Sequence, residues 1–222
     1  MDYRPDAVVF DVLETLLDLD PLAARLEEVG QPSTILGPWF MRFQRDAMAL
    51  TLAGDMAPFE PVARQALRTE TQHKLSEDGI DHVLAGFATL PSFDDAAPAL
   101  RTLSQAGVTV GCLTVGSPDN TRRFLEGAGL SEFVDHVITA QAAGVWKPHP
   151  EIYRFAAERL QIPIERMALV AVHAWDCHGA KRAGALAGWC ARLEYAPGDV
   201  FLPADVTGDS LDEVADKLLN LH

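Results

Sequence analysis

Short apolar runs alternate with helical patterns along most of this chain, and this alternation restricts the folds that it can adopt. The apolar runs lie at residues 7–10, 108–113, 134–139, 167–172 and 188–193. Helical patterns separate or follow them, at 94–106, 118–128, 149–160 and 177–185. Strands that alternate with helices form parallel sheets buried on both faces, which makes each strand apolar nearly throughout. The sequence therefore predicts an α/β fold with a Rossmann-like, doubly wound parallel sheet.

One long segment interrupts the alternation. It has no convincing strand but several helical stretches, notably 38–53 and 59–75. A chain of 222 residues suits one compact domain or a core with an inserted subdomain. We therefore expect a helical cap at 17–89, inserted into an α/β core made of residues 1–16 and 90–222. Asp94 is the expected N-cap where the chain returns to the core.

The charge and the cysteine content exclude several classes of protein. The chain has 32 acidic and 18 basic residues, a net charge of −14, and no basic stretch to neutralise phosphates. We therefore expect no binding to nucleic acid or to an acidic membrane. No apolar run approaches membrane-spanning length. The cysteines Cys112, Cys177 and Cys190 have no CxxC spacing, which indicates reduced thiols in a cytoplasmic protein.

Asp11 directly follows the first apolar run, at the carboxyl end of a predicted buried strand. Open α/β sheets bind their ligands at this end of the strands. An aspartate held there beside a cation can attack an electrophilic carbon or phosphorus as a nucleophile. Thr15, four residues on, can hold the carboxylate through its hydroxyl group. Taken alone, the more economical interpretation is an aspartate that caps a turn.

Residues 114–118 follow the second predicted strand. A hydroxyl group at a strand end, then Gly116 and a helix start, can form a corner that binds anions. The alternative is an ordinary turn with Ser117 as N-cap and Pro118 in the first helical position. We expect Ser117 to be a cap and leave open whether Thr114 faces a ligand.

Lys147 and Asp176 follow later strands of the predicted sheet. A lysine in an apolar loop can neutralise a nucleophilic carboxylate, although a single lysine is more often solvated. Asp176 can pair with it and activate water, or cap a helix. His173 stands at the same strand end as a candidate base or a structural histidine. Tyr153 can close the site or serve as a half-buried structural residue.

In order and spacing, these polar residues resemble the four motifs of the haloacid dehalogenase superfamily. The resemblance spans nearly the whole chain and rests on Asp11, Thr15, Thr114, Lys147-Pro148 and Asp176 with Gly179-Ala180. The helical insert is similar to the small cap of that superfamily. The most similar branch is the L-2-haloacid dehalogenases (type II), on the residues Gly116-Ser117-Pro118, Tyr153 and Ala174-Trp175-Asp176.

Two positions differ from the phosphatases of the superfamily. Leu13 stands where they have the acid that protonates the leaving group. Val172 stands where they have a second magnesium-binding acid, and Mg²⁺ needs several hard oxygen ligands. The resemblance therefore implies carbon–halogen chemistry without a metal or other cofactor. A magnesium-dependent phosphatase remains the alternative, as does a relative that has lost activity.

The chain also differs from the dehalogenase branch. An aromatic residue and a glycine usually follow the nucleophile there, an asparagine follows the motif-two hydroxyl, and motif four has a serine and an asparagine. Here these positions are Leu13, Glu14, Val115, Ala171 and His173. These changes point to a different substrate, another group that activates water, or lost activity.

The first cap helix of that branch supplies the arginine that binds the carboxylate and the halide. An ungapped register places Phe40 at this position and leaves Arg42 or Arg45 as candidates, with Trp39 as a possible apolar wall. The resemblance also suggests a homodimer formed through the cap.

The function that the resemblance implies is hydrolytic dehalogenation of short 2-haloacids, a class of small anionic substrates. Asp11 would displace the halide and form an ester, while Thr114 and nearby amides hold the substrate carboxylate. Lys147, held by Asp176, would keep Asp11 ionised. Water would then cleave the ester, with Asp176 or His173 as base.

Overall fold

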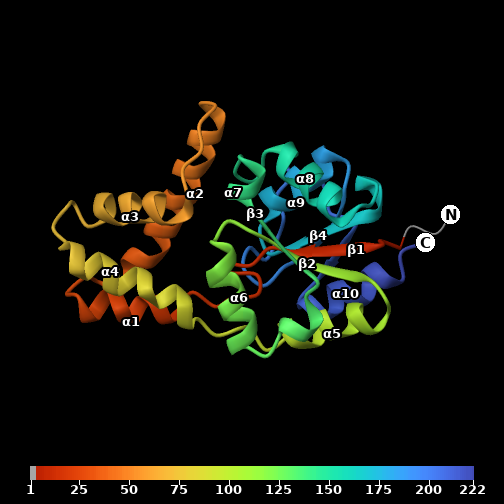
Figure 1. The fold of residues 1–222 in the computed structure, drawn as a ribbon, viewed down its shortest axis with the longest axis horizontal. Helices are drawn as coiled ribbons and strands as arrows, with labels where there is room; N and C mark the ends of the chain where they lie inside the picture. The colour runs from red at the N-terminus through yellow and green to blue at the C-terminus, as the bar shows by residue number, and fades with distance from the viewer. Residues whose placement is uncertain (1–3) are drawn as a thin grey trace.

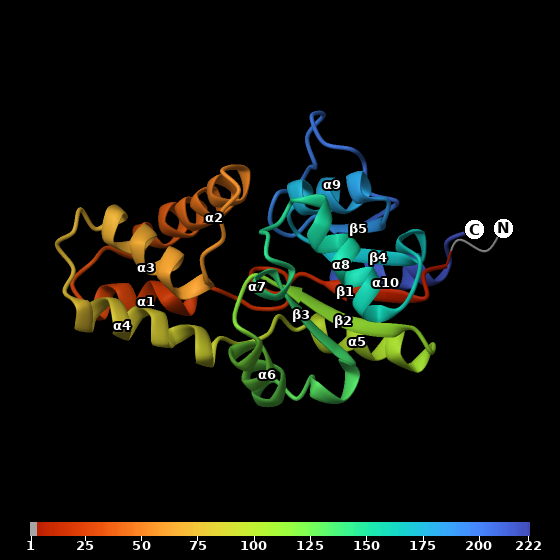
Figure 2. The same cartoon turned by 45° about the horizontal axis from the view of Figure 1, so that its top comes forward.

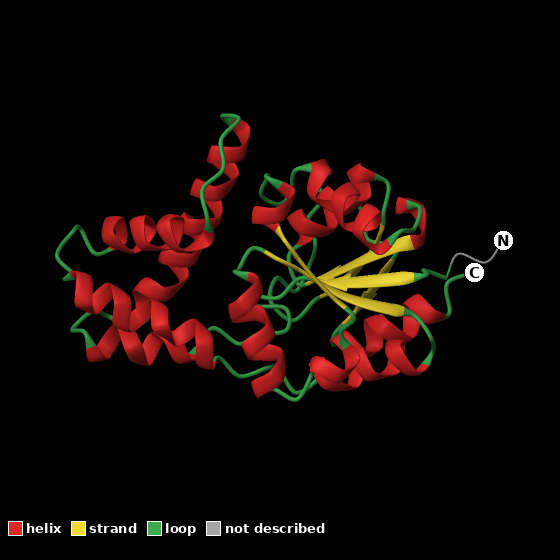
Figure 3. Cartoon of the chain, viewed as in Figure 1, coloured by secondary structure: helices red, strands yellow, loops and turns green. Residues whose placement is uncertain are grey.

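The computed structural model describes residues 4–222 and contains a parallel sheet of six strands with helices on both faces (Figure 1, Figure 3). The strands are β1 (Ala7–Phe10), β2 (Thr109–Thr114), β3 (His136–Thr139), β4 (Met167–Ala171), β5 (Leu186–Cys190) and β6 (Val206–Gly208). Their order is β3-β2-β1-β4-β5-β6, so the winding direction reverses beside β1. This reversal is where doubly wound sheets bind ligands. The predicted fold class is confirmed.

The central strands form because their side chains are apolar on both faces. Every residue of β1 and β4 is buried, as the unbroken apolar runs predict. The last strand was predicted at 188–193, but β5 begins and ends earlier, at Leu186 and Cys190. The short edge strand β6 was not predicted, because only three residues form it and two of them are not fully buried.

The helices of the core follow the strands. They are α5 (Ala96–Gln105), α6 (Pro118–Gly127), α7 (Ala140–Ala143), α8 (Pro150–Leu160), α9 (Ala174–Ala183) and α10 (Leu211–Leu219), with 3₁₀ turns η3 (Ser131–Phe133) and η4 (Ile164–Arg166). Figure 1 shows α8 and α9 on one face of the sheet and α5 and α10 on the other.

Ser117 caps α6 as predicted, because its hydroxyl group accepts a hydrogen bond from the Asn120 amide, and Pro118 begins the helix. The predicted Asp94 cap is wrong, since the N-cap position of α5 is Asp95. The carboxylate of Asp95 instead accepts hydrogen bonds from Arg192 and from the amide of Leu211. Asp95 therefore connects α5 to the C-terminal part of the core.

Four helices lie together beside the carboxyl edge of the sheet (Figure 2). They are α1 (Pro21–Glu28), α2 (Leu36–Leu52), α3 (Phe59–Glu70) and α4 (Glu77–Ala85), with 3₁₀ turns η1 (Ser33–Ile35) and η2 (Gly86–Thr89). The segments that leave and re-enter the core lie side by side: the Asp18 amide donates to the Pro91 carbonyl and the Phe93 amide to the Leu16 carbonyl. We refer to α1–α4 as the cap.

Helix α2 connects the cap to the core. Its buried face packs within the cap through Trp39, whose indole N–H donates to the carbonyl of Ala63. Its middle and C-terminal parts contact the core, where Phe43 packs edge-on against Trp146 and the Thr51 hydroxyl group accepts from the Trp146 amide. α2 is thus the cap element placed over the end of β1. Within residues 4–222, no helix combines the length and apolar character that a membrane span requires.

Candidate active site

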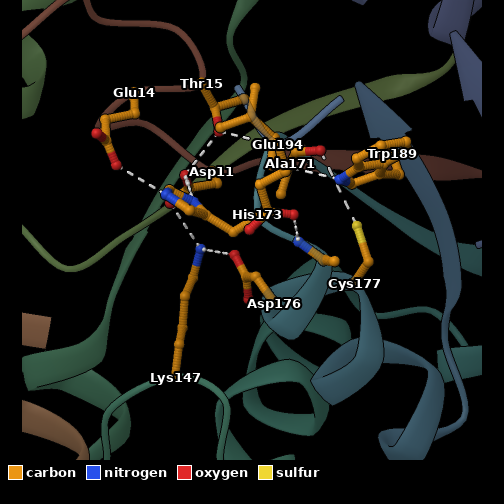
Figure 4. A network of polar contacts seen from close by, with 12 residues as sticks. Asp11, Glu14, Thr15, Lys147, Ala171, His173, Asp176, Cys177, Trp189 and Glu194 are labelled. Atoms are coloured by element: carbon orange, nitrogen blue, oxygen red, sulfur yellow. Dashed lines mark hydrogen bonds and ion pairs between the residues drawn. The ribbon is translucent and has the colours of Figure 1, made fainter. Parts of the chain in front are cut away.

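Asp11, Lys147 and Asp176 form one buried cluster at the carboxyl end of the sheet (Figure 4). Asp11 directly follows β1, Lys147 lies between α7 and α8, and Asp176 lies in the first turn of α9. The Lys147 Nζ is 2.9 Å from Asp11 Oδ1 and 2.8 Å from Asp176 Oδ2. Lys147 is only 2% exposed, which excludes the alternative of a solvated surface lysine. Because α9 begins at Ala174, Asp176 lies within the helix and is not its N-cap.

The two carboxylates and the ammonium group control one another's charge. Burial by itself raises the pKa of Asp11, but Lys147 and His173 outweigh burial and hold that pKa well below its usual value. Burial by itself lowers the pKa of Lys147, but Asp11 and Asp176 reverse this effect and raise it. Burial raises the pKa of Asp176, Lys147 opposes this increase without cancelling it, and Asp11 adds a smaller increase. The neighbouring cations therefore hold Asp11 ionised in spite of its burial.

Thr15 and Tyr153 hold the two carboxylates in place. The Thr15 hydroxyl group donates to Asp11 Oδ2 over 2.7 Å and accepts from the amide of Val172. The Tyr153 hydroxyl group donates to Asp176 Oδ1 over 2.5 Å. Tyr153 is completely buried and fixes Asp176, so it does not close the site against solvent. Both oxygens of Asp176 are thus occupied, one by Lys147 and one by Tyr153.

His173 lies beside the carboxylate oxygen of Asp11 that Lys147 does not contact (Figure 4). Its Nδ1 is 3.6 Å from Asp11 Oδ2, and its Nε2 is 2.8 Å from a carboxylate oxygen of Glu14. Burial by itself lowers the pKa of His173, but its contacts with Asp11 and Glu14 raise it to about 10. His173 is therefore a buried imidazolium between two carboxylates as long as Asp11 carries its charge.

A small cavity opens at Asp11. Most of its walls are apolar or aromatic. They comprise Asp11, Leu13, Phe40, Phe43, Gln44, Ala47, Met48, Val115, Trp146, Lys147, His173 and Trp175. The expectation that Val115 lies at the site agrees with this lining. No arginine belongs to it, and Gln44 is the only polar residue that the cap contributes.

The structure does not bring every candidate to this cavity. Arg42 forms an ion pair with Glu70 on α3, and Arg45 pairs with Asp46 in the same helix. Arg45 reaches a wider neighbouring groove near His173, but neither arginine lines the cavity at Asp11. This placement corrects the expectation that a cap arginine lies at the nucleophile. The physical reason is that acidic partners hold both guanidinium groups away from it.

Trp39 and Thr114 also lie elsewhere. Trp39 is buried inside the cap, against Phe87 and the Ala63 carbonyl, so it does not form a wall of the cavity. Thr114 lines an adjacent pocket, and its hydroxyl group accepts from the Gly116 amide. Thr114 therefore shapes the turn after β2 instead of facing the nucleophile.

The cavity includes residues that the sequence reasoning missed, chiefly Gln44, Met48, Trp146 and Trp175. Trp146 is 1% exposed, and its indole Nε1 has no hydrogen-bond partner among residues 4–222. A buried N–H group without a partner costs about 1–3 kcal/mol, so it is a ready donor for a ligand. Its position directly before Lys147 was the one feature of the sequence that could have placed Trp146 at the site.

The arrangement does not suit a magnesium ion. The carboxylates of Asp11 and Asp176 share the Lys147 ammonium group, and Val172 supplies no side-chain oxygen. Among residues 4–222, no group of three or more His, Cys, Asp or Glu side chains is placed to bind a metal. A hard cation would need further oxygen ligands and would have to displace the lysine.

Comparisons with known proteins agree with this geometry. A family model for haloacid dehalogenase-like hydrolases matches residues 5–184. The (S)-2-haloacid dehalogenase 4A of Burkholderia cepacia is 31% identical over 183 residues, which cover 80% of this chain and 79% of that protein. Two solved structures, a dehalogenase with an intermediate complex and the L-2-haloacid dehalogenase RSc1362, are each 27% identical, with TM-scores of 0.88 and 0.89. They cover 97% and 96% of this chain, and 98% and 97% of their own. The chain belongs to the haloacid dehalogenase-like hydrolases.

Proposed function

We propose that this protein hydrolyses the carbon–halogen bond of short 2-haloacids through an ester on Asp11. The observation that carries the proposal is the ionised carboxylate of Asp11, which contacts a buried lysine and faces a small apolar cavity. An ionised carboxylate in an apolar cavity is a good nucleophile toward carbon. The relatives named as (S)-2-haloacid dehalogenases support this choice of substrate class.

The first step is an in-line displacement. Asp11 attacks the carbon that carries the halogen, forms an ester bond and expels the halide. Lys147 keeps the nucleophile ionised and aligned, and Thr15 fixes its second oxygen. The halide leaves as an anion, so neither a proton donor nor a metal is required at this step. This is consistent with Leu13 at the position where phosphatases of the family have an acid.

Neutral hydrogen-bond donors of the cavity bind the two anions, the departing halide and the substrate carboxylate. The Trp146 indole N–H has no partner in the part of the chain that the structure describes, and the Gln44 side chain lines the cavity from the cap. We assign the departing halide to these two groups in place of a cap arginine. The chain around Val115, which lines the same cavity, is assigned to the substrate carboxylate through its backbone amides.

Phosphatase activity is the second candidate function, and fewer features of the site support it. Attack on a phosphate ester requires a proton for the leaving alkoxide and a cation for the phosphate charge. Leu13 supplies no proton, and the carboxylates are engaged by Lys147. We therefore propose that the enzyme works without a cofactor. Cytoplasmic location and a homodimer through the cap stay predictions.

Two assays separate these functions. With 2-chloropropionate and EDTA, we expect equal amounts of chloride and 2-hydroxypropionate. With p-nitrophenyl phosphate and Mg²⁺, we expect no release of p-nitrophenol above the level of Asp11→Asn. Magnesium-dependent phosphate release without chloride release would contradict the proposal.

A further inference from the structure

Glu14 has an unusual backbone conformation beside the nucleophile. Its φ angle is +66°, in the left-handed region that favours glycine. A side chain there costs of order 1–3 kcal/mol and persists where the surroundings hold it, often at a functional site. The carboxylate of Glu14 contacts His173 Nε2 at 2.8 Å. The backbone strain therefore accompanies a specific contact with a residue that lines the cavity.

His173 connects that carboxylate to Asp11. It is 5% exposed and follows β4, and its Nδ1 has no hydrogen-bond partner within the structure. This nitrogen faces Asp11 Oδ2 at 3.6 Å, and His173 lines the cavity (Figure 4). A ring nitrogen in this position can take a proton from water attacking the Asp11 carbonyl carbon.

We propose that Glu14 and His173 form a dyad in which His173 is the base that hydrolyses the Asp11 ester and Glu14 orients it. This inference rests on the proposed dehalogenase function and deepens it. In this dyad His173 is a catalytic residue, because it faces the reacting group directly. Glu14 is a positioning residue that acts through the imidazole ring.

The other candidate base, Asp176, is already occupied. Its Oδ2 accepts from Lys147 and its Oδ1 from Tyr153, and it is completely buried. It does not line the cavity at Asp11. Proton transfer from water to Asp176 would first have to break one of these two contacts, whereas His173 Nδ1 has none to break.

The charge of Asp11 makes the dyad respond to the stage of the reaction. The charged groups around His173 are Asp11 and Glu14, with Lys147 beyond Asp11 and Glu194 held by the amide of Ala174. In the resting enzyme the Asp11 carboxylate helps to raise the pKa of His173, so the ring is protonated. Esterification removes that negative charge, which lowers the pKa of His173 and allows it to release a proton.

The sequence of steps balances. Asp11 displaces the halide, and His173 releases one proton to solvent. Water then adds to the ester carbonyl carbon while His173 takes a proton from that water. The C–O bond to the substrate breaks, and the alkoxide takes the proton of the new Asp11 hydroxyl group. The products are the 2-hydroxy acid, one halide ion and one proton, and ionised Asp11 and protonated His173 are restored.

Single-turnover kinetics test the dyad. In His173→Ala, we expect a halide burst of one equivalent at a rate close to wild type, measured at a pH where Asp11 is fully ionised, because Lys147 still contacts Asp11. Release of the hydroxy acid should be about 10²-fold slower or more, the range for loss of a general base. Intact-protein mass spectrometry should then detect the enzyme with the substrate bound as an ester.

Glu14→Gly is the second variant, and its glycine suits the backbone conformation. It should slow only ester hydrolysis, and the pH at which hydrolysis becomes half-maximal should decrease, because Glu14 raises the pKa of His173. Glu14→Gln keeps a polar contact and should recover part of the rate without restoring the pH profile. The exposed Glu28–His82 pair of the cap provides matched controls, Glu28→Gln and His82→Ala, which should behave as wild type.

The outcomes separate the two proposals. Normal halide release with unslowed hydrolysis in His173→Ala would overturn the dyad and leave the dehalogenase function standing. Equal slowing of both steps would also overturn it, because that result assigns His173 to substrate binding. Absence of halide release in the wild type would overturn the proposed function itself, and the role of the dyad with it.

Discussion

The carboxyl edge of the sheet and helix α2 both line the cavity, but they contribute different physical properties. The sheet edge supplies buried charge: Lys147 meets Asp11 across 136 positions of the sequence and Asp176 across 29. Helix α2 supplies apolar walls, with Gln44 as its one polar group there. Its arginines pair with acids outside the cavity. The core therefore holds the groups for bond breaking, while the cap selects substrates through the shape of the cavity.

The largest effect should come from the core. Asp11→Asn keeps the size of the side chain but removes the nucleophile, so turnover should fall by about 10⁴-fold or more. The thermal midpoint should stay close to that of the wild type, since Lys147 keeps Asp176 as an acceptor and the one amide oxygen of the asparagine can accept from Thr15. Halide release and a melting curve measure both quantities. Residual turnover within tenfold of wild type would contradict a nucleophilic Asp11.

Lys147→Met removes the shared cation and leaves two buried carboxylates without their partner. The expected cost is about 3–5 kcal/mol of unfolding free energy, as for other broken buried ion pairs. Halide release should fall strongly because the pKa of Asp11 rises when Lys147 is lost. Urea unfolding provides the measurement. The control is Lys217→Met in an exposed pair with Glu213, which should change stability by less than about 1 kcal/mol.

A smaller effect is expected from Trp146→Phe, which keeps an aromatic ring but removes the indole N–H. One lost hydrogen bond to an anion should weaken inhibition by added chloride or bromide about tenfold. The rate of ester hydrolysis should change little, because Trp146 does not contact the dyad. An unchanged inhibition constant would remove this donor from the halide site.

The smallest effect should come from the cap arginines. Arg42→Gln and Arg45→Gln should leave kcat/KM within about twofold of wild type, because neither arginine lines the cavity at Asp11. Steady-state halide release measures this. A loss of 10²-fold in either variant would show that the cap brings an arginine to the nucleophile during turnover, and the division between core and cap would fail.

The sequence predicted the chemistry of the core because parallel strands all end at one edge. Asp11 and Asp176 both follow strands at this edge, and Lys147 lies in a loop at the same edge. Of the cap residues, the ungapped register placed Phe40 at the cavity, but Trp39, Arg42 and Arg45 do not line it, since one residue of register turns a helix by about 100° and exchanges a wall position for a surface position. Phe40 therefore faces the cavity while Arg42 pairs with Glu70.

Other parts of the chain were missed for different reasons. Helix α10 was not predicted, although Leu211, Val214, Ala215 and Leu218 have helical spacing and are buried. The contact of Glu14 with His173 depends on a left-handed residue in a short turn, which no periodic pattern indicates. The partnerless indole N–H of Trp146 follows from packing alone.

Oxygen isotope labelling tests the ester directly. In one turnover with enzyme in excess in H₂¹⁸O, attack of water on the Asp11 carbonyl carbon should place ¹⁸O in the Asp11 side chain. The 2-hydroxy acid should then carry unlabelled oxygen from Asp11. Label in the hydroxy acid after this first turnover, with Asp11 unlabelled, would contradict covalent catalysis by Asp11.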